Sequence, residues 1–314
     1  MARFRAVNRI GVYGVVFLML ATLLATPSAA TVIRAGSGNT DAPGDDPGWA
    51  NVGARMGTAG TAVYLGDRWV LTAGHVGGGT VDFGGVVYGM EPGSWQLLHD
   101  PDNSGTPADL GLFRLTAAPV GLYDLVISQS APADGARVVG IGYGTNQASS
   151  ETWWNGMWEK ETGTEAYRGF ELLSGRTKRW GKNDVDGTLV VDTGSPYRTH
   201  ALAMDFDRFG GAGDDEMQAV PGDSGGGLFH KKNGTDWELA GIWIARDIYP
   251  PDPLHGVPQQ PYDTAAYGNS SFAADLSQYR GQILAIVPEP SILVMLLGLG
   301  AGCLVWSVWR RAGR

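Results

Sequence analysis

The feature that most constrains the fold of this chain is a series of short apolar segments separated by glycine-rich turns. Strands of this length at regular spacing are typical of a β-sandwich or a β-barrel. Helical periodicity is weak outside the two termini and residues 275–286, so we expect an all-β fold with one short C-terminal helix. The segments are 61–65, 69–72, 80–88, 95–98 and 110–115, followed by 137–141, 187–191, 226–229, 237–244 and 271–274.

One glycine-rich turn carries a candidate nucleophile. Residues 222–226 read Gly-Asp-Ser-Gly-Gly and place Ser224 between glycines. A serine hydroxyl attacks a carbonyl only when a base takes its proton, and the resulting oxyanion needs hydrogen-bond donors. Glycines allow the backbone to bend so that two N–H groups face one point. We expect the N–H groups of Gly222 and Ser224 to be these donors.

The partners of such a serine lie upstream in the chain. Residues 69–76 (Trp-Val-Leu-Thr-Ala-Gly-His-Val) end a buried strand with His75, and residues 107–115 place Asp109 at the start of an apolar strand. In a triad, His75 serves as base and then acid, while Asp109 fixes its tautomer and Ser224 attacks. Each residue alone also has a structural interpretation, His75 as a core histidine and Asp109 as a turn or ion-pair residue.

Together these segments resemble the Thr-Ala-Ala-His-Cys, Asp-Ile-Ala-Leu and Gly-Asp-Ser-Gly-Gly motifs of the chymotrypsin/trypsin family of serine proteases, in the same order. The resemblance implies two antiparallel six-stranded β-barrels, about 56–128 and 129–286, with the active site between them. It implies a serine endopeptidase that forms an acyl-enzyme and needs no cofactor or metal. The family's Asp before the nucleophile pairs with a freed N-terminus. Residues 32–36 match the family's Ile-Val-Gly-Gly start only loosely.

Substrate preference is expected from three positions. In the family, the residue six before the nucleophile forms the base of the primary pocket, and here that residue is Gln218. Because Lys/Arg specificity needs an acid there, we predict against it. The segment 241–244 resembles the pocket-lining strand and makes Trp243 and Ile244 candidate substrate-binding residues. Two other functions stay open, a catalytically silent protease-like binding protein at the cell surface and an esterase with the same triad.

Both ends of the chain carry targeting patterns. Three arginines precede an apolar run at 11–24 and small residues at 27–30, which is the pattern of a secretory signal peptide (residues 1–30). A membrane anchor is the alternative interpretation. Pro-Glu-Pro at 288–290 precedes 19 uncharged residues, 291–309, and then three arginines. That length spans a bilayer.

The C-terminal pattern, residues 287–314, resembles the PEP-CTERM sorting signal, with an ordinary C-terminal anchor as the alternative. The resemblance implies a Gram-negative host, export across the inner membrane to the cell envelope or beyond, and an exosortase-type processing partner. It leaves open whether the product is released or stays anchored.

The net charge and the cysteine content limit the kinds of partner and the sources of stability that we expect. Without the six terminal arginines the formal net charge changes from −9 to −15, which disfavours nucleic-acid binding. The one cysteine, Cys303, lies in the C-terminal apolar segment, so the exported part has no disulfide. We therefore expect a protein or peptide substrate and a domain stabilised by its core.

Four further segments of the sequence have less specific interpretations. Residues 31–55 are predicted to be a flexible arm or a segment wrapping the domain. Residues 145–186 are predicted to be an insertion whose tryptophans pack against the barrel rather than bind a partner. Gly-Ile-Gly-Tyr-Gly at 140–144 resembles a family turn more than a nucleotide loop, and residues 205–216 form an acidic loop with partial calcium-loop spacing.

Overall fold

The computed structural model describes residues 31–36, 38–162, 166–192 and 196–287. The predicted signal peptide (1–30) and the predicted C-terminal membrane helix (291–309) lie outside these residues. Within the described ranges, none of the helices has the length and apolar character needed to cross a bilayer.

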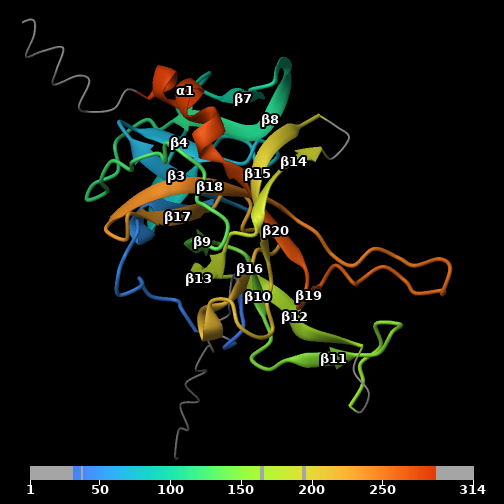
Figure 1. Ribbon diagram of the computed structural model, residues 1–314. Coiled ribbons are helices and arrows are strands. Elements are labelled where there is room, and N and C mark those ends of the chain that lie inside the picture. Colours follow the sequence, from blue (N-terminus) through green and yellow to red (C-terminus); the bar gives the residue numbers. More distant parts are fainter. Residues whose placement is uncertain (1–30, 37, 163–165, 193–195, 288–314) are drawn as a thin grey trace, which may run out of the picture.

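Two antiparallel seven-stranded sheets make up most of the molecule, which confirms the all-β prediction (Figure 1). The first sheet has the order β6-β5-β2-β3-β4-β8-β7 and the second β13-β9-β17-β18-β20-β15-β14. The first comprises β2 (Val52–Arg55), β3 (Gly60–Gly66), β4 (Trp69–Thr72), β5 (Val81–Phe83), β6 (Val86–Tyr88), β7 (Gln96–Asp100) and β8 (Asn103–Arg114). The second comprises β9 (Arg137–Gly142), β13 (Arg179–Asp184), β14 (Gly187–Asp192), β15 (Arg198–Asp205), β17 (Gly227–Lys232), β18 (Asp236–Arg246) and β20 (Ser270–Asp275).

Each sheet therefore has one strand more than the six predicted. In the first sheet the reason is local, because Gly84 and Gly85 have φ values of 65° and 91° and turn the chain back on itself. The segment predicted as one strand at 80–88 is thus a hairpin of β5 and β6. Two glycines with positive φ are the usual requirement of such a two-residue turn.

The N-terminal segment is not a free arm. Val32 and Ile33 form β1, are fully buried, and pair with β16 (Met217–Gln218). Residues 49–51 form the 3₁₀ turn η1, and β2 at 52–55 lies inside the first sheet. The prediction of an arm over 31–55 is corrected accordingly, because its apolar residues join the core, and the alternative of a wrapping segment describes it better.

The predicted insertion is shorter than 145–186. Residues 179–184 form β13, which pairs with β9 in the second sheet. The preceding part contributes β10 (Thr145–Gln147), β11 (Thr152–Trp154) and β12 (Tyr167–Arg176) to a small sheet, in which β12 also pairs with β19 (Thr264–Ala266). This sheet lies at the opposite end of the molecule from α1 (Leu276–Ile286) (Figure 1). Trp154 and Trp158 are buried against this sheet, in agreement with a packing role.

One hydrophobic cluster joins the two large sheets. It contains Val63 and Leu71 of the first sheet together with Ile141, Phe229 and Ile242 of the second. The helix α1, predicted over 275–286, packs its buried Leu276, Tyr279 and Ile283 into the same cluster. Because both sheets share this core, residues at their junction are held in a fixed relative position.

We expect Phe229→Ala to lower the free energy of unfolding by about 3–5 kcal/mol, because the ring is fully buried and its removal leaves a cavity at the junction of the sheets. Urea unfolding followed by tryptophan fluorescence measures the loss. Val87→Ala, at a site 56% exposed, is the matched control and should change stability by less than about 0.5 kcal/mol. Similar losses in the two variants would contradict a shared core.

Candidate active site

His75 and Asp109 are in direct contact. The carboxylate Oδ2 of Asp109 lies 2.7 Å from Nδ1 of His75, and Oδ1 accepts the backbone N–H of His75 at 2.8 Å. His75 follows β4 in a tight turn, while Asp109 lies on the neighbouring strand β8. The Asp109 carboxylate is thus fixed by two contacts with one residue. Its contact with Nδ1 leaves Nε2 of His75 as the basic nitrogen.

A residue of the second sheet also positions Asp109. The Oγ1 atom of Thr199, on β15, accepts the backbone N–H of Asp109 at 2.8 Å. Thr199 is 1% exposed, so this hydrogen bond is shielded from water. The sequence analysis missed Thr199, because no local motif marks a threonine that contacts a strand 90 positions away.

The turn around Ser224 depends on glycine at two positions. Gly222 and Gly225 have φ values of 100° and 87°, a region that L-residues rarely adopt. A Cβ at Gly225 would lie 2.0 Å from the carbonyl oxygen of Thr61. Thr61 also donates its N–H to Ser224 O and its hydroxyl to Gly222 O, both at 2.8 Å. The first sheet therefore anchors the turn that carries Ser224.

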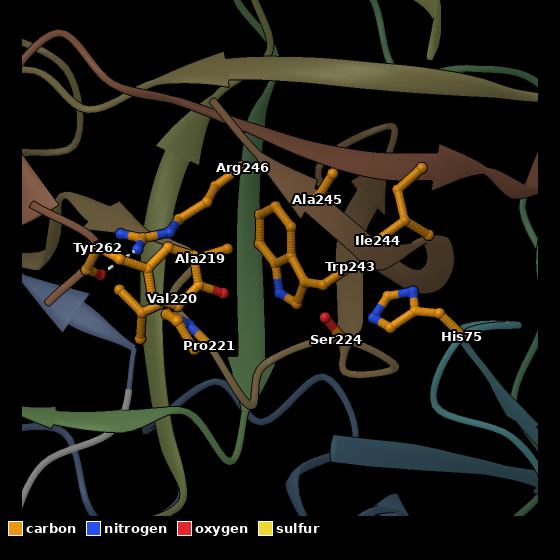
Figure 2. Close-up of a pocket in the computed structure, with 10 residues that line it drawn as sticks. All are labelled: His75, Ala219, Val220, Pro221, Ser224, Trp243, Ile244, Ala245, Arg246 and Tyr262. Atoms are coloured by element: carbon orange, nitrogen blue, oxygen red, sulfur yellow. Dashed lines mark hydrogen bonds between the residues drawn. The ribbon is translucent and has the colours of Figure 1, made fainter. Parts of the chain in front are cut away.

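Ser224 and His75 line the same pocket (Figure 2). Among the described residues, no hydrogen bond joins the Ser224 hydroxyl to the His75 ring, as is common in ligand-free sites. Within the same ranges, the backbone N–H groups of Gly222 and Ser224 donate to no other protein group. The predicted oxyanion donors are thus available to a ligand.

Asp223 is buried beneath this turn. Its carboxylate accepts the backbone N–H of Val220 at 2.9 Å and the hydroxyl of Thr31 at 3.1 Å. An added Cβ at Gly142 or Gly144 would lie 2.2 or 2.5 Å from this carboxylate, so the glycines of the 140–144 segment make room for it. Burial raises the pKa of Asp223 to about 7.

The pocket beside Ser224 has a volume of about 240 Å³. Trp243 and Ile244 line it, together with Arg246 at the end of β18 and Tyr262, which the sequence analysis missed. Gln218 is not among the lining residues. It is fully buried, pairs with Val32 across β1 and β16, and donates its side-chain N–H to Asn269 at 3.1 Å. Its expected place at the base of the pocket is corrected, because the N-terminal segment covers it.

Two clusters contain acidic side chains of the kind that bind cations. Asp100, Asp102 and His200 converge within 4.8 Å, but Arg198 already pairs with both carboxylates. In the acidic loop, the Glu216 carboxylate accepts backbone N–H groups from Asp207 and Ala212 and is fully buried. Neither arrangement resembles an open metal site.

Comparisons with known proteins place one segment in a family. The model of the PEP-CTERM protein-sorting motif matches residues 287–311, which confirms the predicted sorting signal. No curated protein matches the chain. Similar solved structures include mouse neuropsin, a serine protease (16% identity, 80% of this chain and 98% of that chain, TM-score 0.47). Another is the inactive form of the Rv3671c protease of M. tuberculosis (16% identity, 76% and 88%, TM-score 0.41).

We expect the stability of the protein to fall as the pH rises from about 4 to about 7. In this window the raised pKa of Asp223 lets the folded state hold a proton that the unfolded chain, with a pKa of about 3.9, has lost. Glu216, whose pKa burial also raises to about 7, contributes in the same direction. Asp223→Asn should therefore flatten the decrease, as measured by urea midpoints at pH 4 to 8.

The exposed Asp236→Asn variant is the control and should keep the wild-type slope. If stability changes with pH at the same slope in Asp223→Asn and wild type, the pKa of Asp223 does not differ between the folded and unfolded states, contrary to what its burial requires.

Proposed function

We propose that this protein is an exported serine endopeptidase that hydrolyses peptide bonds through His75, Asp109 and Ser224. The observation that carries the proposal is the double contact of Asp109 with His75, whose ring lines one pocket with the Ser224 hydroxyl. An imidazole oriented by a carboxylate beside a serine in a glycine turn has the parts of a nucleophilic triad.

In this mechanism Asp109 accepts Nδ1–H of His75, so Nε2 takes the proton of Ser224 as the hydroxyl attacks the carbonyl. The N–H groups of Gly222 and Ser224 stabilise the oxyanion, and their lack of other partners within the described residues supports this role. His75 then gives the proton to the leaving amine. The amine departs, and the acyl group stays on Ser224 as an ester. Water hydrolyses this ester by the same proton transfers.

The C-terminal signal supports a cellular setting for this activity. A PEP-CTERM motif over 287–311 indicates a protein that is exported and sorted at the cell envelope. We infer that an exosortase-type enzyme processes this segment and that the substrates are proteins or peptides outside the cytoplasm. The proposed division of the chain is thus a signal peptide at 1–30, a protease domain and the sorting segment.

We expect Ser224→Ala and His75→Ala to lower turnover of a peptide substrate by about 10⁴- to 10⁶-fold, because each removes a member of a cooperating set. Covalent labelling by a fluorophosphonate probe and hydrolysis of a mixed peptide library are the measurements. Ser130→Ala, at an exposed serine, is the control and should retain labelling and hydrolysis.

Labelling that persists in Ser224→Ala would exclude Ser224 as the nucleophile. A folded wild-type protein that neither takes up the probe nor cleaves peptides would favour a binding protein. Hydrolysis of esters without hydrolysis of peptides would favour an esterase.

Thr199→Val should lower kcat/KM about tenfold, because it leaves the buried N–H of Asp109 without its acceptor and loosens the acid that orients His75. Thr199→Ser restores a hydroxyl and should recover most of the activity. Steady-state kinetics on one peptide measures both variants. A loss in Thr199→Val that Thr199→Ser fails to rescue would mean that side-chain volume, rather than the hydrogen bond, is what matters.

A further inference from the structure

Arg246 stands at the far end of the pocket that contains Ser224. Figure 2 shows Ser224 and His75 at one end and the guanidinium of Arg246 at the other, beside Tyr262. Two backbone carbonyls hold the group, since NH1 donates to Thr264 O at 2.8 Å and NH2 to Tyr262 O at 2.6 Å. The cation is therefore fixed in place.

This positive charge has no carboxylate partner within the described ranges. Among the described residues, Arg246 forms no ion pair, and its Nε is shielded from solvent without a hydrogen-bond partner. The ring of Tyr262, 4.9 Å from the guanidinium carbon, is a weak neutral partner. Burial lowers the pKa of Arg246 from its usual value, yet an arginine side chain stays protonated in proteins. A desolvated cation with an unused N–H is a costly arrangement unless an anion arrives.

Asp223 cannot be that anion. Asp223 acts on Arg246 electrostatically, but it is not among the residues that line the pocket. Its two oxygens accept hydrogen bonds from Val220 and Thr31 on the buried side of the turn. The pocket itself thus presents a positive end and, between that end and Ser224, the apolar side chains of Ala219, Val220, Pro221 and Trp243.

We propose that this pocket selects an acidic side chain, glutamate or aspartate, on the residue whose carbonyl Ser224 attacks, with Arg246 as the specificity-determining residue. The inference rests on the proposed function and names the substrate class of the same site. A carboxylate that enters the pocket forms charge-assisted hydrogen bonds with the guanidinium edge. A lysine or arginine side chain meets like charge, and a neutral side chain leaves the cation unpaired.

The test compares peptides that differ only at this residue. The full chain, produced in an exporting bacterial host and purified in detergent, is assayed with peptide p-nitroanilides ending in Glu, Asp, Gln, Phe or Lys. Because the nitroanilide is the leaving group, the varied side chain belongs to the attacked carbonyl. We expect kcat/KM for Glu or Asp to exceed that for Gln by roughly 30-fold or more, with Lys the poorest. Equal or better cleavage after Gln, Phe or Lys overturns the proposal.

Variants identify the residue responsible. Arg246→Gln should reduce the Glu/Gln ratio of kcat/KM to about one, and Arg246→Lys should keep part of the preference. Arg137→Gln, an arginine of the second sheet that pairs with Asp184 outside the pocket, is the matched control. An unchanged ratio in folded Arg246→Gln, as judged by circular dichroism, excludes Arg246 as the determinant.

A binding measurement separates this inference from the proposed activity. Ser224→Ala is titrated calorimetrically with acetyl-Ala-Ala-Pro-Glu-amide and with the matching Gln-amide, and we expect at least tenfold tighter binding of the Glu peptide. If the probe labels the wild-type protein but neither the cleavage assay nor the binding assay shows a preference for acidic peptides, the pocket proposal is overturned and the proposed function stands. Absence of both labelling and cleavage overturns the proposed function, and equal binding of the two peptides then overturns the pocket proposal as well.

Discussion

The contact between the two large sheets is the interaction on which the site depends. His75 and Asp109 belong to the first sheet, while Ser224 precedes β17 of the second. Thr61 of the first sheet bonds to Ser224 O and Gly222 O, and Thr199 of the second accepts from Asp109. Each half of the site is thus tied to the other by a threonine. These bonds keep their geometry only because a common apolar core prevents the sheets from sliding.

A second constraint on the site is the close approach of the backbone at residues 142–144 to the Asp223 carboxylate. Asp223 fits beneath the turn that carries Ser224 because Gly142 and Gly144 have no Cβ, and the buried N-terminal segment closes the space with the hydroxyl of Thr31. The segment that looked like a nucleotide loop or a family turn therefore has a packing role, which is to accommodate an acid. The same N-terminal segment covers Gln218, so it shapes the turn and the pocket together.

Local motifs explain what the sequence could predict. The fold class, the C-terminal helix and the positions of His75, Asp109 and Ser224 follow from short contiguous patterns. Thr199 and Arg246 could not be found in this way, because their proposed roles depend on contacts with segments distant in sequence. The expectation for Gln218 failed for a related reason, since counting six residues back from Ser224 takes no account of β1 pairing above it. The hairpin at Gly84 and Gly85 shows that a pair of glycines inside an apolar run can indicate a turn between two strands.

Buried charge near the turn that carries Ser224 limits the stability of the fold. Burial lowers the pKa of Lys178 to about 7 and that of Arg179 to about 10. All three side-chain nitrogens of Arg179 lack hydrogen-bond partners among the described residues. Groups of this kind cost free energy that packing must offset, and the part of the chain before Cys303 has no disulfide to help. The shared core therefore has two tasks. It aligns residues from both sheets, and it supplies stability that offsets the cost of buried charges without an ion-pair partner among the described residues, such as Arg246.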